Sequence, residues 1–321
     1  MKIMVTGGAG FIGSHVVDGY IESGHDVLVV DDLSTGKRSN VHPEARFFEL
    51  DIRSPETAGL IKSEVPQAIN HHAAQASVPF SVAEPRNDAD INIQGFINIL
   101  EAAVKGGVEK VIFISSGGAV YGDARQYPTA EGCAPEPLSP YAVSKFASEK
   151  YLAFYRHQYG LSTTVLRYAN IYGPRQAPHG EAGVVAIFME NILSGRDSIL
   201  YQFPDDAAGM IRDYCYVGDV VKANLKALHR ETDGCFNIGS GKETRTLALY
   251  ETIWAAIRET KPDLPRSPSM LNRRPARPGD IPRSCLIVDK ARGALGWGAD
   301  TDVKTGVRHT LAWCLQPGNH S

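Results

Sequence analysis

A glycine-rich turn at residues 7–13 separates a short apolar run from a segment with helical spacing. Residues 2–6 have the composition of a buried strand, and apolar residues recur at helical intervals from Phe11 to Tyr20. Three glycines fit the G-x-G-x-x-G spacing: Gly8, Gly10 and Gly13. Glycine at these positions permits a tight turn, close approach of the backbone to a pyrophosphate, and close packing of helix on strand. We therefore predict a dinucleotide-binding turn, with the phosphates at the positive end of the helix.

An aspartate follows the second apolar run, which covers residues 26–30. Asp31 lies eighteen residues after Gly13, near the distance at which dinucleotide-binding folds place a carboxylate for the adenosine ribose. Such a carboxylate accepts hydrogen bonds from the ribose and repels a 2′-phosphate. The cofactor is therefore expected to be NAD and not NADP.

Apolar runs alternate with segments of helical period along the first 170 residues, a pattern typical of a parallel sheet with helices on both faces. The further predicted strands are 46–50, 67–71, 110–115, 163–167 and 235–238, and the predicted helices are 51–65, 87–105, 141–159, 182–193, 219–229, 289–295 and 303–315. Residues 261–282 carry six prolines and are expected to be largely extended loop. The predicted fold class is α/β: a doubly wound parallel Rossmann sheet with a smaller, discontinuous C-terminal α/β lobe.

The chain is expected to divide into two domains built from alternating segments. Residues 1–170 plus about 215–240 would form the NAD-binding Rossmann domain, and about 171–214 plus 241–321 would form the second domain. Ligands of open parallel sheets bind in the cleft beyond the carboxyl ends of the strands, so we expect the functional site there.

The composition gives no reason to expect a nucleic-acid or membrane partner. The formal net charge is −3, and no uninterrupted apolar run approaches bilayer length. Five cysteines are scattered without a C-x-x-C pair, which suits a reducing compartment and makes them poor metal ligands. Because the first strand is predicted to begin at residue 2, we expect no signal peptide. The expectation is a cytoplasmic protein without a metal site.

Tyr141 and Lys145 stand four residues apart just after Pro140, at the start of a predicted helix. This spacing places both side chains on one face of the helix. A nearby ammonium group lowers the pKa of a phenol, and the positive charge of an NAD⁺ nicotinamide would add to the effect. Tyr141 is therefore predicted to act as a base near neutral pH. The alternative interpretation is an amphipathic helix with an exposed lysine.

With these motifs in place, the chain resembles the extended short-chain dehydrogenase/reductase family, and within it most closely the UDP-glucose 4-epimerases. The resemblance rests on residues 5–15, 31–37, 72–78, 115–122, 141–145, 166–176, 212–220 and 277–280. It implies a tightly bound NAD that takes a hydride from C4 of a UDP-hexose and returns it to the other face of the 4-keto sugar. Tyr141 would take the proton of the 4-hydroxyl, and Lys145 would orient the nicotinamide ribose. The second domain would then bind the nucleotide sugar.

The resemblance also implies the other contacts of cofactor and substrate. The implied cofactor-binding residues are Gly7, Gly10, Phe11, Ile12, Gly13, Asp31, Asp32, Asp51, Ile52, Ala73, Ala74, Gln75, Asn92, Ser115, Tyr141 and Lys145. The implied UDP-binding residues are Asn170, Arg212, Arg277 and Asp280. The two arginines suit a diphosphate because a guanidinium group matches phosphate oxygens bidentately. The neighbouring Arg273 and Arg274 have no such match.

The small residues at positions 117–119 limit the reactions that the chain is expected to catalyse. Gly117 stands where relatives usually carry a Ser or Thr whose hydroxyl helps to polarise the 4-oxygen. We hypothesise that Ser116 substitutes for it in catalysis; a water molecule in that role, or reduced activity, is the alternative. Dehydratase and decarboxylase relatives carry acidic residues for proton transfer at C5 where this chain has Gly118 and Ala119. Epimerisation needs no such group and is favoured.

The choice of sugar and of reaction leaves alternatives open. Ser284 stands four residues after Asp280, where relatives carry a bulky tyrosine against the hexose. The small side chain predicts that UDP-N-acetylhexosamines are also accepted. An epimerase that prefers UDP-GlcNAc or UDP-glucuronate, a net dehydrogenase, and a non-catalytic NAD-binding sensor are the alternatives.

The resemblance further implies a homodimer. Relatives pair two helices from each subunit, which here correspond to residues 87–105 and 141–159. The candidates for this face are Phe96, Ile99, Phe146 and Phe154, and packing in the core would explain them equally well.

Overall fold

The computed structural model describes residues 1–178, 183–229, 231–262, 271–277 and 280–318. A seven-stranded parallel sheet has the order β10-β6-β5-β4-β1-β2-β3. Its strands are β1 (Lys2–Thr6), β2 (Asp26–Asp31), β3 (Arg46–Glu49), β4 (Ala68–His71), β5 (Lys110–Ser116), β6 (Ser162–Tyr168) and β10 (Gly234–Ile238). The chain order reverses between β1 and β4, which is where open parallel sheets bind ligands. The predicted α/β fold class is confirmed.

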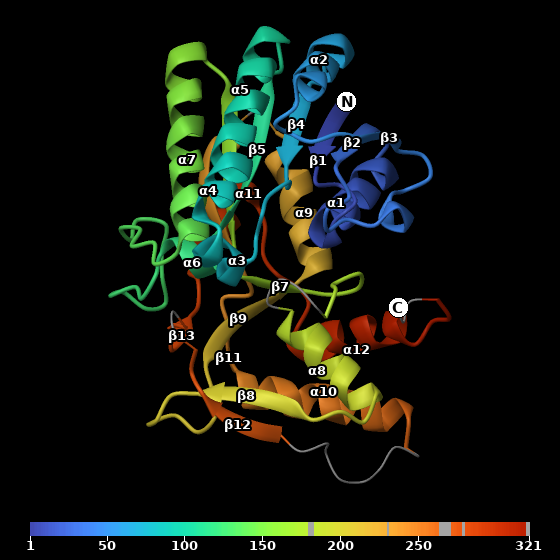
Figure 1. The fold of residues 1–321 in the computed structure, drawn as a ribbon, viewed down its shortest axis with the longest axis vertical. Coiled ribbons are helices and arrows are strands. Elements are labelled where there is room, and N and C mark those ends of the chain that lie inside the picture. Colours follow the sequence, from blue (N-terminus) through green and yellow to red (C-terminus); the bar gives the residue numbers. More distant parts are fainter. Residues whose placement is uncertain (179–182, 230, 263–270, 278–279, 319–321) are drawn as a thin grey trace.

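Helices cover both faces of this sheet (Figure 1). One face packs against α1 (Phe11–Glu22), α9 (Val217–Ala227) and α11 (Asp289–Leu295), and the other against α2 (Pro55–Glu64), α5 (Phe96–Lys105) and α7 (Pro140–Tyr159). Successive residues of a strand point to opposite faces of the sheet, so they belong alternately to the two cores. Ile3 and Val5 lie in one core and Met4 in the other. Burial on both faces explains why the strands are continuous apolar runs.

Two predicted helices differ from the observed ones. The first, predicted at 51–65, begins only at Pro55, because the Ser54 hydroxyl accepts a hydrogen bond from Thr57 N (3.2 Å) and caps the helix there. The second, predicted at 87–105, consists of α4 (Pro85–Ala89), a wider π-helical turn η2 (Asp90–Gly95) and α5. A shorter helix, α3 (Val78–Ala83), precedes them.

A second, smaller part lies below the large sheet in Figure 1. Its strand β9 (Ile211–Tyr216) pairs with three short strands, β7 (Asn170–Tyr172), β11 (Glu243–Arg245) and β13 (Arg283–Ser284), and β8 (Ser198–Gln202) pairs with β12 (Leu271–Pro275). Its helices are α8 (Val184–Leu193), α10 (Thr246–Thr260) and α12 (Val303–Cys314). The expectation of extended loop over 261–282 is therefore wrong for β12, whose backbone pairs with β8.

Residues 286–297, which precede α12, return to the large sheet. Their apolar residues lie in the same core as α1 and α9: Leu286, Val288, Ala291, Leu295 and Trp297. Trp297 also donates its indole N–H to the Asp219 carbonyl oxygen in α9 (2.8 Å). The predicted bounds of the two domains stay a prediction. Among the described residues, no helix is long and apolar enough to span a membrane.

Candidate active site

The glycine turn after β1 leaves no room for side chains. Gly7 has a φ of +71°, and a Cβ on it would lie 2.5 Å from Ala73 N. A Cβ on Gly13 would overlap the Gly7 carbonyl oxygen. Gly10 precedes the first residue of α1 and forms no side-chain hydrogen bond with the first N–H groups of the helix. The turn can therefore bring a helix N-terminus close to the phosphates of a dinucleotide, so the residues present fit the predicted NAD.

Asp31 closes β2 beside this turn and is almost fully buried. Its Oδ2 accepts from Ala9 N and its Oδ1 from Leu33 N, both at 2.9 Å. Burial raises the pKa of its carboxyl group. The adjacent Asp32 accepts from the Ser34 backbone and hydroxyl. Asp31 thus shapes the glycine turn as well as lying where the ribose contact was predicted.

The next two predicted cofactor contacts, Asp51 and Ile52, follow β3. The Asp51 carboxylate pairs with Arg53, which lowers the pKa of Asp51. Ile52 is buried against the wide turn, since a Cβ on Gly95 would lie 2.7 Å from Ile52 Cδ1. Both residues follow the carboxyl end of β3, and their contact with the cofactor stays a prediction.

The loop after β4 carries Ala73, Ala74 and Gln75, and it is bound to the wide turn. Asn92 Oδ1 accepts from Gln75 N (2.9 Å), and Asn92 Nδ2 donates to the Gln75 carbonyl oxygen (2.8 Å). Ala73 lies against Gly7. The structure therefore brings Asn92, distant in sequence, to the loop beside the glycine turn.

The predicted catalytic pair lies on the first turns of α7. Pro140 occupies the first turn, and the Ser139 hydroxyl accepts from Ala142 N (3.2 Å). Lys145 is buried, donates to the Ile114 carbonyl oxygen (2.9 Å), and has its nitrogen 5.9 Å from the centre of the Tyr141 ring. The ammonium group is thus fixed next to the phenol, at the carboxyl end of β5.

A buried ion pair beneath this site was not predicted. Glu149, four residues after Lys145, forms a salt bridge with Arg167 of β6 (2.6 Å) and accepts from the Ser115 hydroxyl (2.6 Å). Arg167 also donates to the Tyr121 hydroxyl (2.8 Å). The spacing of four from Lys145 was the available signal. Ser115, a predicted cofactor contact, is therefore held by α7.

Ser116 is half-buried and directly precedes the short helix α6 (Gly117–Val120), which packs against α7. A Cβ on Gly117 would lie 2.7 Å from Leu286 Cδ1. Leu286 thus fills the space that a side chain at position 117 would need. The role of Ser116 stays a prediction.

The five predicted substrate contacts lie at the smaller sheet and its edge. Arg212 in β9 pairs with Ser284 in β13, and Asn170 begins β7. Arg277 Nε forms a salt bridge with Asp280 Oδ2 (3.2 Å). The structure therefore groups residues that are more than one hundred positions apart in the sequence, and the contact of each with substrate stays a prediction.

Arg212 differs from the other arginines of this region. Burial lowers the pKa of its guanidinium group, and its donors reach the Ile211 carbonyl oxygen (2.8 Å) and Met210 Sδ (3.1 Å). Within the described part of the chain, no carboxylate forms a salt bridge with it. A partly buried cation without an anionic partner is suited to bind a phosphate.

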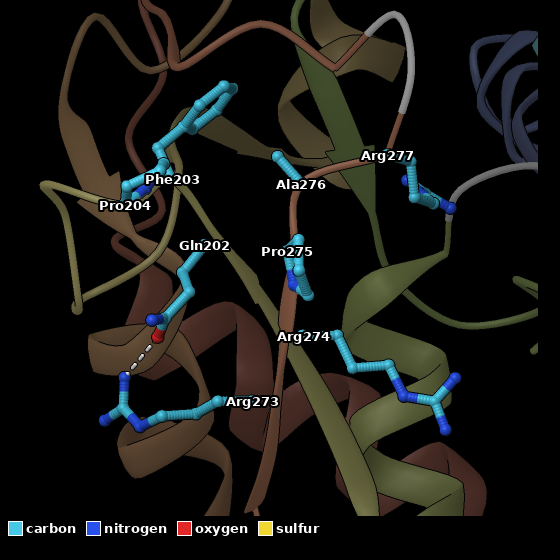
Figure 2. A pocket seen from close by; sticks show the side chains of 8 residues that line it. All are labelled: Gln202, Phe203, Pro204, Arg273, Arg274, Pro275, Ala276 and Arg277. Atoms are coloured by element: carbon cyan, nitrogen blue, oxygen red, sulfur yellow. Dashed lines mark hydrogen bonds between the residues drawn. The ribbon is translucent and has the colours of Figure 1, made fainter.

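A cavity of about 480 Å³ adjoins Arg277 and is lined by residues 202–204 and 273–277 (Figure 2). Arg273 lies on one side of β12 and donates to Gln202 Oε1 (2.7 Å), whereas Arg274 and Arg277 lie on the other side. The Arg277 guanidinium stacks 4.7 Å from the centre of the Tyr201 ring. The cavity thus combines aromatic and cationic groups.

Two buried polar atoms lie where the large and small sheets meet. Among the described residues, Asn170 Nδ2 and Gln176 Oε1 have no hydrogen-bond partner. Buried polar groups are rarely left unpaired, so these atoms are candidates for ligand contacts. Gln176 was not singled out from the sequence, although it ends the motif 166–176.

Comparison with known proteins agrees with this geometry. A family model described as the NAD dependent epimerase/dehydratase family matches residues 3–239. The chain is similar to a solved UDP-glucose 4-epimerase from Thermotoga maritima with UDP-glucose, at 45% identity and a TM-score of 0.90, with 98% of each chain covered. A UDP-glucose 4-epimerase from Thermus thermophilus in complex with NAD is 42% identical, with a TM-score of 0.89 and 98% of each chain covered.

A third relative acts on a different sugar. A UDP-N-acetylglucosamine 4-epimerase from Methanobrevibacter ruminantium, in complex with UDP-N-acetylmuramic acid, is 32% identical, with a TM-score of 0.88 and 97% of each chain covered. The family model spans well over half of the chain, and the predicted family and its dependence on NAD are confirmed. The chain belongs to the NAD dependent epimerase/dehydratase family.

Proposed function

We propose that the chain is a 4-epimerase that interconverts UDP-glucose and UDP-galactose through a 4-keto sugar. The observation that carries this proposal is the Tyr141–Lys145 pair at the carboxyl end of β5, where the Ile114 carbonyl oxygen holds Lys145 with its nitrogen 5.9 Å from the centre of the Tyr141 ring. Two solved relatives that are 45% and 42% identical are UDP-glucose 4-epimerases, which supports the same reaction here. A non-catalytic NAD-binding sensor would have no use for a buried lysine fixed next to a tyrosine.

The residues of the chain handle the proton and the position of the sugar. NAD, when bound, supplies the chemistry of hydride removal and return at C4. Tyr141 takes the proton of the 4-hydroxyl and later gives it back, and the positive charge of Lys145 favours the phenolate. The Ile114 carbonyl oxygen keeps the ammonium group in place. We assign the hydrogen bond to the 4-oxygen to Ser116, because Leu286 fills the space at Gly117.

The smaller sheet would hold the UDP moiety. Arg212 would pair with the diphosphate, for which it has the charge and no competing carboxylate among the described residues. Arg277 would also pair with the diphosphate, Asp280 would contact the rest of the nucleotide, and Asn170 Nδ2 would donate to it. Each of these contacts replaces water lost by a polar group on binding.

One assay tests the proposed reaction. The purified protein is given UDP-galactose with and without added NAD⁺, and UDP-glucose is measured together with the absorbance of free NADH. An epimerase forms UDP-glucose without accumulating NADH, whereas a net dehydrogenase accumulates NADH and a sensor forms no product. Ser116→Ala should lower turnover; unchanged turnover would show that Ser116 is not the hydroxyl donor.

The range of sugars depends on Ser284. Its small side chain leaves room beside the hexose, and the relative from Methanobrevibacter ruminantium is a UDP-N-acetylglucosamine 4-epimerase. We therefore propose that UDP-GlcNAc is also a substrate. Ser284→Tyr should reduce turnover of UDP-GlcNAc far more than that of UDP-galactose. A wild-type protein that converts UDP-galactose and leaves UDP-GlcNAc unchanged would refute this extension.

We also propose a homodimer through α7 and its neighbours. Val143, Tyr151 and Phe154 form one exposed apolar stripe on α7. Phe96 and Ile99 cannot belong to this face, because both are fully buried in the core. Light scattering during size-exclusion chromatography should show a dimer, and Phe154→Lys should yield monomers. A wild-type monomer would exclude the proposal.

We further propose a cytoplasmic location. All five cysteines are free, as is usual in a reducing compartment. Cell fractionation with an antibody against the protein should find it in the cytoplasmic fraction, and recovery from the medium or the membrane would contradict the proposal.

A further inference from the structure

A buried carboxylate beside α7 has no part in the chemistry assigned so far. Asp88 in α4 is fully buried, and within the described residues no cation forms a salt bridge with it. Three neutral groups donate to it instead: Gln75 Nε2 (2.8 Å), Asn92 Nδ2 (3.0 Å) and the Ser144 hydroxyl (2.6 Å). Burying a carboxylate is costly unless several donors satisfy it. Its three donors point to a use beyond packing.

The three donors come from three different segments. Gln75 belongs to the loop after β4, Asn92 to the wide turn η2, and Ser144 to α7. Ser144 stands directly before Lys145 and three residues after Tyr141. One carboxylate therefore joins a loop predicted to contact the cofactor to the helix that carries the catalytic pair.

A second link joins the same segments. The Ser148 hydroxyl of α7 donates to the Asn92 carbonyl oxygen (3.0 Å). A π-helical turn shifts the backbone hydrogen bonds of a helix, and such turns occur frequently at functional sites. Asn92 thus binds α7 by its backbone and the β4 loop by its side chain, while Asp88 fixes that side chain through its amide.

We propose that Asp88 is a positioning residue for catalysis. Its carboxylate holds α7 and the loop after β4 in one relative position, so that the Tyr141–Lys145 pair keeps a single orientation toward the cofactor-binding loops. A carboxylate suits this role because it accepts hydrogen bonds from all three donors, whereas an amide presents one acceptor and donors of its own. This inference rests on the proposed epimerase function.

The test compares Asp88→Asn with Glu84→Gln, which removes an exposed carboxylate next to the same helix. Small displacements of catalytic groups cost about tenfold to hundredfold in rate. Asp88→Asn should therefore lower kcat for UDP-galactose by such a factor with KM within about twofold of wild type, and it should release bound NAD faster during gel filtration. Glu84→Gln should match wild type in all three measurements.

A double variant separates positioning from general destabilisation. Because Asp88 acts through the Tyr141–Lys145 pair, Asp88→Asn combined with Tyr141→Phe should lose less turnover than the product of the two single losses. Independent, multiplying losses would overturn the proposal, as would an unchanged kcat in Asp88→Asn. If that variant does not fold, Ser144→Ala replaces it: a lowered kcat at unchanged melting temperature supports the proposal, and an unchanged kcat overturns it.

The readouts also separate this proposal from the function on which it rests. If the wild type does not epimerise UDP-galactose, the proposed function fails, and the rate of NAD release still tests the link between Asp88 and the cofactor loop. If the wild type is active and Asp88→Asn equals Glu84→Gln in kcat and NAD release, only the positioning role fails.

Discussion

The predicted cofactor side and the predicted substrate side of the site differ in how their polar groups are satisfied. On the cofactor side, Asp31, Ser115 and Lys145 each form hydrogen bonds of 2.9 Å or less with other groups of the protein. On the substrate side, among the described residues, Arg212 lacks a carboxylate partner and Asn170 Nδ2 lacks any hydrogen bond. The polar groups named on the first side are satisfied within the protein. Those named on the second side have bonding capacity left for a ligand.

This difference indicates which groups maintain the structure and which groups determine the affinity for substrate. Groups that are already paired hold the backbone and orient the chemistry, so changing them should disturb both stability and cofactor retention. Groups without a partner contribute little to stability and can even lower it, so changing them should affect substrate affinity alone. Four substitutions test this distinction.

The largest effect is expected for Tyr141→Phe. Removing the hydroxyl removes the group that exchanges the substrate proton, and a positioned acid or base contributes about 10²–10⁴-fold to rate. Turnover of UDP-galactose should fall by that factor. Binding of UDP, measured by calorimetry, should stay within about twofold of wild type, since the phenol is not among the predicted UDP contacts. Retention of full turnover would refute the catalytic assignment.

Arg212→Met should separate affinity from stability. A hydrogen bond to a charged group contributes about 1.5–3 kcal/mol, so affinity for UDP should fall by about tenfold to hundredfold. The melting temperature should be unchanged or higher, because a partly buried charge is removed. Arg292→Met, which changes an exposed arginine on α11, is the control. A lower melting temperature with unchanged UDP affinity would show that Arg212 maintains the structure and does not bind UDP.

Asp31→Asn should show the opposite pattern. The new amide would turn an N–H group toward one of two backbone N–H groups that now reach the carboxylate. An unsatisfied buried donor costs about 1–3 kcal/mol, so we expect about tenfold weaker retention of NAD together with a lower melting temperature. Asp26→Asn at the exposed start of β2 should change neither quantity. Weaker retention of NAD at an unchanged melting temperature would show that the hydrogen bonds of Asp31 within the protein do not contribute to stability.

The smallest effect is expected for Gly117→Ser. Its side chain would crowd Leu286 Cδ1, and overpacking of this kind typically costs about 1 kcal/mol or more. Unfolding in urea should show this loss, and Gly117→Ser combined with Leu286→Ala should recover part of it. If Gly117→Ser leaves the free energy of unfolding unchanged, Leu286 does not exclude a side chain at position 117. The reason for assigning the hydrogen bond to Ser116 is then lost.

The sequence predicted the large sheet well because burial on both faces leaves a local signal. Strands such as β1 and β5 are continuous apolar runs, and the glycine turn and Asp31 mark the cofactor side within the first 31 residues. The pair Tyr141 and Lys145 could be placed on one helix face from spacing alone. These features depend on neighbours in the chain, so they can be read without tertiary contacts.

The smaller part was harder to predict because its strands are short or exposed. β12 has the sequence Leu-Asn-Arg-Arg-Pro and is largely exposed, and β13 has only two residues. Asp88 would be assigned to the exposed face of a polar helix, since its donors Gln75 and Ser144 come from distant segments. Whether Arg212 has an anionic partner likewise depends on contacts that no local pattern encodes.

The return of residues 286–297 to the large sheet has a consequence for synthesis. Strand β10 and the apolar side chains from Leu286 to Trp297 complete the core on the α1 face. A ribosome makes these segments after the strands β1 to β6, so the earlier strands emerge before their final partners exist. The nascent chain must therefore keep one face of its first sheet incompletely covered until Trp297 has been translated.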